Sequence, residues 1–219
     1  MQAIRKLALT ILTAAASAQT LDQIAVSTHV RADGGSAAIE VTLTNNSPRI
    51  VTAWAWTIEG QYAGASSKSH SGTVDALMDL VTDVAFRPGT SRTFQEFLPL
   101  GPSGDLPTST TAKMTMVVVD DDTALGDPIS VHRLGAERKR QAASYASELA
   151  KIEEALKTAS PKDSLSAFLS QSPNGTLGIS RQILGLLKMN ADPAGIDSAL
   201  KAFHTQQALF AAHSNLLPK

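Results

Sequence analysis

The sequence Ala37-Ala38-Ile39-Glu40-Val41-Thr42-Leu43-Thr44-Asn45-Asn46-Ser47-Pro48 contains the clearest strand and turn in this chain of 219 residues. Apolar side chains occupy every second position from Ala37 to Leu43, and a period of two is typical of a strand with one buried face. The four residues from Asn45 to Pro48 predict a turn, because asparagine tolerates left-handed backbone and proline cannot continue a strand ladder. We expect a hairpin whose return strand runs from Ile50 to Ile58.

The expected return strand carries no charged side chain, so we expect it to be central in its sheet and covered on both faces. Other β-rich runs lie at residues 24–30, 92–98, 112–119 and 129–132. The Gly- and Ser-rich stretch 60–73 predicts a loop, and the apolar spacing within 74–84 fits a short helix as well as a strand. Six or seven short strands predict an antiparallel β-sandwich of the immunoglobulin-like type over residues 19–133.

From residue 134 onward the apolar spacing is that of helices. Apolar residues recur at intervals of three and four and form one stripe along a helix, at Ala142, Tyr145, Leu149, Ile152 and Leu156. This stripe predicts a long helix that Ser160-Pro161 ends, and shorter helices are expected at 162–170 and 178–189. Asp192-Pro193 predicts the N-cap and first turn of a last helix. Residues 134–219 are therefore predicted to form a helical C-terminal region.

The composition excludes several kinds of chemistry. The chain has no cysteine, which rules out disulfides, thiolate nucleophiles, cysteine-ligated zinc and iron–sulfur clusters. Its 19 basic and 20 acidic residues give a net charge of −1, so we do not expect a nucleic acid as partner. We also expect no membrane span, because no segment after residue 20 approaches the roughly 18 apolar residues that a spanning helix needs.

The first residues have the pattern of a signal peptide. Arg5 and Lys6 precede the apolar run 7–15, and Ala16-Ser17-Ala18 is a small-x-small cleavage site. We expect residues 1–18 to be removed after Ala18, so that the mature chain begins at Gln19. Export without cysteine favours a bacterial periplasm or the external medium.

Two groups of residues invite a metal site. Asp120, Asp121, Asp122 and Asp127 would offer oxygen ligands to calcium, although they lack EF-hand spacing and equally fit a turn in which carboxylates cap backbone amides. The histidines are His29, His70, His132, His204 and His213. They include no pair at the spacing of a zinc motif, although His29 and His132 fall on the expected first and last strands and would meet there.

Further patterns in the sequence fit an ordinary structural role as well as a functional one. Ser198-Ala199-Leu200-Lys201 matches Ser-x-x-Lys, but about one such match is expected by chance and the companion motifs are missing. Arg133 with Glu137-Arg138-Lys139-Arg140 forms a basic patch or a solvated helix face. Trp54 and Trp56 fit a buried sandwich core better than an exposed ligand platform. The sequons at Asn45 and Asn174 are read as turns in a bacterial protein. We assign no catalytic, cofactor-binding or metal-binding residue.

Two segments resemble the bacterial extracytoplasmic immunoglobulin-like domains. The stretch from Ile39 to Pro48 is followed by a Trp-bearing strand, and Arg87-Pro88-Gly89-Thr90-Ser91-Arg92 later supplies a Pro-Gly-Thr turn before another strand. This broad class includes adhesion modules, periplasmic chaperone domains and proteinase-inhibitor-like sandwiches. The resemblance implies the fold of residues 22–133 and assigns no site residue.

We therefore expect an exported, non-enzymatic binding or structural module with a protein partner in the envelope or medium. Strand addition is the expected mechanism if a strand edge is exposed, since main-chain hydrogen bonds supply the affinity. The alternatives are a hydrolase with scattered Asp and His residues between sandwich and helices, and an inhibitor with a protruding loop such as 60–73. Titratable groups converging in a cleft would favour the hydrolase.

Overall fold

The computed structural model describes residues 23–33, 36–64, 66–78, 86–101, 103–171 and 178–218. The predicted signal peptide and the sequon at Asn174 lie outside these residues. The chain divides into two compact units, one made of residues 1–132 with 216–219 and the other of residues 133–215.

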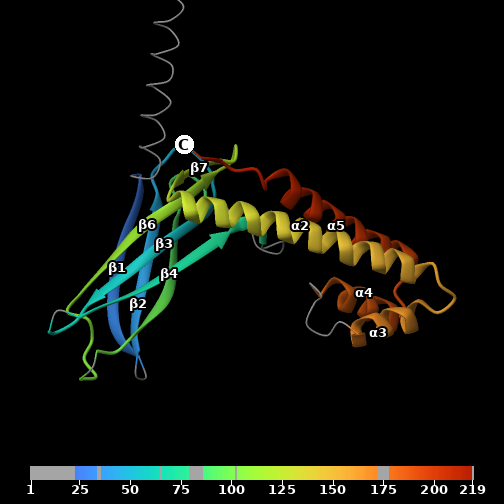
Figure 1. Ribbon diagram of the computed structural model, residues 1–219, viewed down its shortest axis with the longest axis horizontal. Coiled ribbons are helices and arrows are strands. Elements are labelled where there is room, and N and C mark those ends of the chain that lie inside the picture. Colours follow the sequence, from blue (N-terminus) through green and yellow to red (C-terminus); the bar gives the residue numbers. More distant parts are fainter. Residues whose placement is uncertain are drawn as a thin grey trace, which may run out of the picture. The chain divides into compact units, whose positions relative to one another are not determined.

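The first unit consists of two sheets (Figure 1). The three-stranded antiparallel sheet has the order β1-β2-β5, with strands β1 (Ile24–Asp33), β2 (Ser36–Asn45) and β5 (Ser91–Pro99). The five-stranded sheet has the order β4-β3-β6-β7-β8, with strands β4 (Ser67–Asp75), β3 (Val51–Gln61), β6 (Ser109–Val119), β7 (Thr123–Gly126) and β8 (Leu217–Pro218). All neighbours are antiparallel except β7 and β8, which are parallel. A 3-10 turn, η1, covers Ala76–Met78.

The inner faces of both sheets share one hydrophobic core. Ile39, Val41 and Leu43 of β2 and Trp54 and Ile58 of β3 belong to the same buried cluster. The strand β3 lies between β4 and β6, and its other face is also buried at Ala53 and Ala55. The predicted central strand is confirmed, and the two sheets form a sandwich around residues that alternate along the strands.

The predicted hairpin, in which the strand from Ala37 to Leu43 pairs with the return strand from Ile50 to Ile58, is wrong, because β2 and β3 lie in different sheets. The backbone groups of Asn45 are already occupied: its N–H donates to the Thr90 carbonyl at 3.0 Å, and its carbonyl accepts from Gly89 at 2.7 Å. Val51 pairs instead with Phe86, at 2.9 and 3.0 Å. The Asn45–Pro48 turn therefore carries the chain from one sheet to the other.

Three further segments differ from or refine the predictions. Most of the expected loop 60–73 is strand, because β3 continues to Gln61 and β4 begins at Ser67 as an edge strand rich in small polar residues. The expected strand 129–132 is the first turn of a helix, where the Asp127 carboxylate accepts from Ser130 N at 2.9 Å. The ambiguous stretch 74–84 finishes β4 and forms η1 as far as Met78, and its remainder lies outside the described residues.

The second unit is helical. The helices are α2 (Pro128–Leu156), which begins in the first unit, α3 (Pro161–Gln171), α4 (Ile179–Lys188) and α5 (Pro193–Ala212). Leu149 and Ile152 of the predicted apolar stripe are buried in a core with Leu165, Ile183 and Phe203. The predicted N-cap is confirmed, since Asp192 Oδ1 accepts from Gly195 N at 2.7 Å. Residues 217–218, expected in the helical region, form β8 instead, and Leu217 N donates to the Asp122 carbonyl at 3.0 Å.

Candidate functional site

The strand β6 is covered by its neighbour β7 along only part of its length. β3 pairs with β6 from Ser109 to Val119, whereas β7 pairs only with Met116, Val117 and Val118. Within the part of the chain that the structure describes, residues 109–114 are therefore paired through main-chain hydrogen bonds with a strand on one side only. Because alternate residues of an antiparallel strand direct N–H and C=O groups to opposite sides, half of these main-chain groups point away from β3.

A β-bulge in the pairing of β3 with β6 lies next to the point where the pairing between β6 and β7 ends. Ala55 is opposite Met116 but Trp56 is opposite Met114, which leaves Thr115 as an extra residue. The Thr115 carbonyl accepts from Asp127 N at 2.8 Å. Gly126 has a φ of +108°, and a Cβ there would lie 2.2 Å from the Thr115 oxygen, so glycine is required. The chain then leaves the sheet and enters α2.

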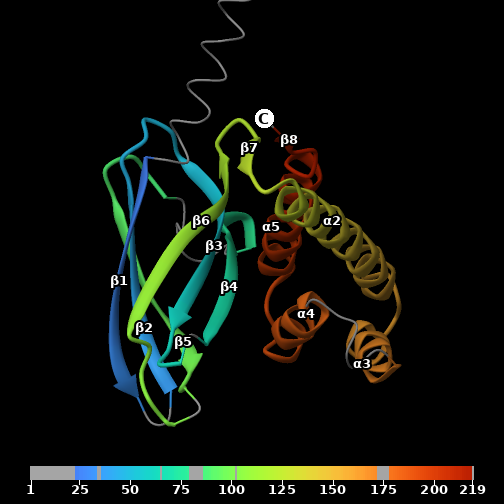
Figure 2. The ribbon, with the colours of Figure 1, turned by 60° about the vertical axis from the view of Figure 1, so that its left-hand side comes forward.

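The strand β1 lies across from the open half of β6 (Figure 2). Thr28 Oγ1 of β1 and Thr110 Oγ1 of β6 are 3.1 Å apart and share a hydrogen bond. The core-facing Val26 and Val30 of β1 and Ala112 of β6 pack against the core but are only partly buried. We call these five residues the β1–β6 seam. It combines an unpaired strand edge with apolar side chains whose burial is incomplete.

The ionisable side chains beside the seam are basic. On β6, and on β1 from Ile24 to Arg31, they are His29, Arg31 and Lys113, all exposed. Arg31 Nη2 donates to Gln95 Oε1 of β5 at 3.2 Å. The carboxylates of Glu40 and Glu59 lie one strand further in, because Glu40 is opposite His29 and Glu59 is opposite Thr111.

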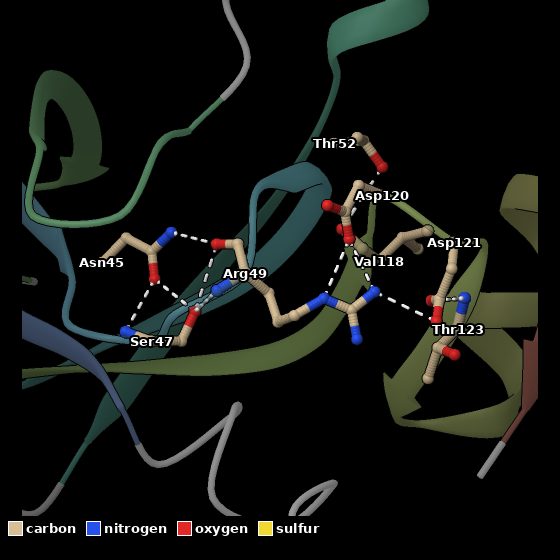
Figure 3. A network of polar contacts seen from close by, with 8 residues as sticks. All are labelled: Asn45, Ser47, Arg49, Thr52, Val118, Asp120, Asp121 and Thr123. Carbon is tan, nitrogen blue, oxygen red and sulfur yellow. Dashed lines mark hydrogen bonds and ion pairs between the residues drawn. The ribbon is translucent and has the colours of Figure 1, made fainter.

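The acidic group proposed for calcium forms a network at the start of β7 (Figure 3). Arg49 donates to Asp120 Oδ1 from Nε at 2.9 Å and from Nη2 at 2.6 Å, and its Nη2 is 3.0 Å from Asp121 Oδ2. Asp121 Oδ1 accepts from Thr123 N at 3.0 Å. Burial opposes ionisation of Asp121, but the hydrogen bonds from Thr123 and Arg49 outweigh it and lower its pKa to about 2. Asp127 likewise accepts from backbone N–H at the start of α2, so these carboxylates cap backbone amides as expected for a turn.

The network continues into the buried side chain of Asn45. Its Nδ2 donates to the carbonyls of Phe86 at 2.8 Å and Arg49 at 2.9 Å, and its Oδ1 accepts from Ser47 N at 3.0 Å and Ser47 Oγ at 2.6 Å. Both N–H bonds of the amide are used and the side chain is buried, so this sequon is a turn in the folded protein. The two segments that carry the immunoglobulin-like resemblance meet at this residue.

The structure does not bring the histidines together. His70 Nε2 lies 3.0 Å from Glu96 Oε2, which links β4 to β5, and His204 Nε2 lies 2.8 Å from Glu153 Oε1. His132 is on α2, so the expected meeting of His29 and His132 on two strands is wrong. No group of three or more potential metal ligands is found among the described residues.

The remaining candidate residues from the sequence lie on the surface of helices or in structural contacts. Ser198 and Lys201 are exposed on α5. Arg138 does not belong to a surface patch, because it is buried and its Nη1 donates to the His213 carbonyl at 2.8 Å, at the end of α5. Glu137 pairs with Arg140. Trp54 and Trp56 are buried, with ring centroids 5.6 Å from Phe86 and 4.6 Å from Phe94 respectively, so the core interpretation is confirmed.

The fold and the seam define a β-sandwich with an open strand edge, followed by helices. No model of a known protein family matches the chain, and no curated protein matches it. Among solved structures, the chain has a match to the Salmonella enterica trimeric lipoprotein SadB, with 11% identity and a TM-score of 0.32, over 53% of this chain and 75% of that chain. A TM-score of this size does not establish a common fold. No helix in the described residues is long and apolar enough to cross a membrane.

Proposed function

We propose that this chain is an exported binding module of the bacterial envelope or external medium, and that its sandwich takes up an extended segment of a protein partner by strand addition. The observation that carries the proposal is the open half of β6, residues 109–114, which faces β1 across the seam. Main-chain groups on an unpaired edge bind an added strand without special side chains.

An added strand would complete the structure in two ways. It would continue the line of β7 along β6 and pair the main-chain groups that point away from β3. It would also cover Val26, Val30 and Ala112, which the sandwich itself buries only in part. Burial of apolar surface contributes about 25 cal/mol per Å², so this covering adds to the main-chain hydrogen bonds.

We further propose that the sandwich is of the immunoglobulin-like type. Strands one, two and five form one sheet and strands three, six and seven are neighbours in the other, as in constant-type immunoglobulin domains. The strand β4 lies beside β3, in the place of the additional strand C′ of variable-type domains.

Site-specific crosslinking in intact host cells tests the proposal. A photoreactive residue at Thr111, exposed on the open half of β6, is expected to capture a protein, whereas one at Thr73, exposed on β4, is not. The recovered chain is expected to have the intact mass of a chain that begins at Gln19. Capture at position 73 and none at 111 would contradict the proposed edge, and a mass that begins at Met1 would contradict export.

A further inference from the structure

We infer that the segment taken up at the β1–β6 seam is acidic: small apolar or hydroxyl side chains point to the core, and Asp or Glu residues alternate with them on the outward face. This inference rests on the proposed function and specifies the chemistry of the partner.

The inward side chains must be small. Thr28 Oγ1 and Thr110 Oγ1 already touch across the seam at 3.1 Å, so an added strand has to replace this contact. Its inward positions then meet the side chains of Val26, Val30 and Ala112, which face the filled core of the sandwich. Ala, Val, Ser and Thr fit such positions, whereas large side chains would overpack the core.

The outward side chains meet a basic environment. An added strand would lie about 4.8 Å from β6 and so place its outward residues beside Lys113, with Arg31 and His29 on the other edge strand. Glu59 is on β3, one strand further, at about twice that separation. At physiological salt the screening length is about 8 Å, so the nearer lysine outweighs the glutamate.

The test uses three synthetic peptides of nine residues with the same alternating Ala, Val and Thr positions. The intervening positions are all Glu, all Lys or all Ser. The Glu peptide is expected to bind roughly fivefold more tightly than the Lys peptide at low salt, because opposite charges across strands attract and like charges repel. The difference should shrink at high salt.

Matched variants test whether Lys113 causes the preference for the Glu peptide. Lys113→Glu is expected to remove or reverse the preference, whereas Lys139→Glu, the same charge change at an exposed position of α2, is expected to leave it unchanged. Equal affinity for the three peptides would overturn the acidic preference but would not contradict strand addition. Binding of none of them would also overturn it, and capture at position 111 in cells tests the proposed function separately.

Discussion

Replacing Gly72 with alanine is expected to destabilise the sandwich by about 2 kcal/mol, although the change adds only one methyl group. Gly72 of β4 is opposite Trp56 of β3, and a Cβ at this position would lie 2.2 Å from Cζ2 of the indole. The indole cannot give way, because it is buried and packs on Phe94 with 4.6 Å between ring centroids. The clash exceeds the 0.5–1 kcal/mol or so that a strand ordinarily gains when glycine becomes alanine.

Denaturant unfolding followed by tryptophan fluorescence measures this effect, since Trp54 and Trp56 are the two tryptophans of the chain and both lie in the sandwich core. Gly185→Ala in the helical unit is the control for the same chemical change, and its unfolding is followed by helical circular dichroism because both tryptophans lie in the sandwich. A Cβ there meets nothing within 4 Å on α4, so no loss of stability is expected. Trp56→Phe should make room, so that adding Gly72→Ala to it costs less than in the wild type. A Gly72→Ala variant as stable as the wild type would contradict the packing described for β3 and β4.

Asn45→Asp is expected to cost about 3 kcal/mol at neutral pH. The amide donates to two carbonyls, those of Phe86 and Arg49, and accepts from Ser47 N and Ser47 Oγ. An ionised carboxylate has no hydrogen to donate, so both carbonyls lose their partner and face a buried negative charge. The segment around Phe86 would then lose a hydrogen bond that ties it to the crossing between the sheets.

The pH dependence distinguishes charge from shape. Burial and the facing carbonyls raise the pKa of a carboxyl at position 45 in the folded state, so its ionisation destabilises the variant as the pH rises above the unfolded value of about 4. Below about pH 4 the group is protonated in both states and regains one donor, so the deficit relative to the wild type should narrow. Asn46→Asp makes the same change at an exposed neighbour, where a difference of less than about 0.5 kcal/mol is expected. Equal deficits at positions 45 and 46 would contradict the buried hydrogen-bond network.

Much of the fold could be predicted because local patterns and tertiary packing agree. The alternation in β2, the uncharged run from Ile50 to Ile58 and the apolar stripe from Tyr145 to Leu156 each correspond to a buried face or stripe. Which strands pair with one another could not be predicted in the same way. The turn at Asn45–Pro48 shows where the chain changes direction, but whether it pairs with itself or crosses to another sheet depends on Phe86, Gly89 and Thr90, about 40 residues away.

The predictions for short segments were wrong where the patterns of two kinds of structure overlap. β4 reads as a loop because an edge strand with one covered face tolerates Ser, Lys, His and Gly. The run 129–132 reads as a strand, yet Asp127-Pro128 followed by Ser130 is an N-cap with proline in the first turn, and this signal would have placed a helix there.

The seam had no signal in the sequence. It results from the short length of β7, which has no residue pattern of its own. Nothing in the sequence Gly126-Asp127-Pro128, where β7 ends and α2 begins, indicates that half of β6 would lack a hydrogen-bonded neighbour on that side. The residues considered as candidate sites in the sequence mostly had reactive side chains, and none was assigned, whereas this edge is made of main chain, valine, threonine and alanine.

The most direct test of strand addition is to close the seam covalently. In a Thr28→Cys/Thr110→Cys variant the two cysteines are the only ones in the chain, and the hydroxyls they replace are 3.1 Å apart, so oxidation should join β1 to β6. Thr44→Cys/Ser91→Cys is the matched control, because it links β2 and β5, which already pair, through hydroxyls 2.9 Å apart. We expect the oxidised seam variant to lose binding of the protein captured at position 111 and to regain it on reduction, while the control binds in both states. Undiminished binding by the oxidised seam variant would contradict strand addition at this edge.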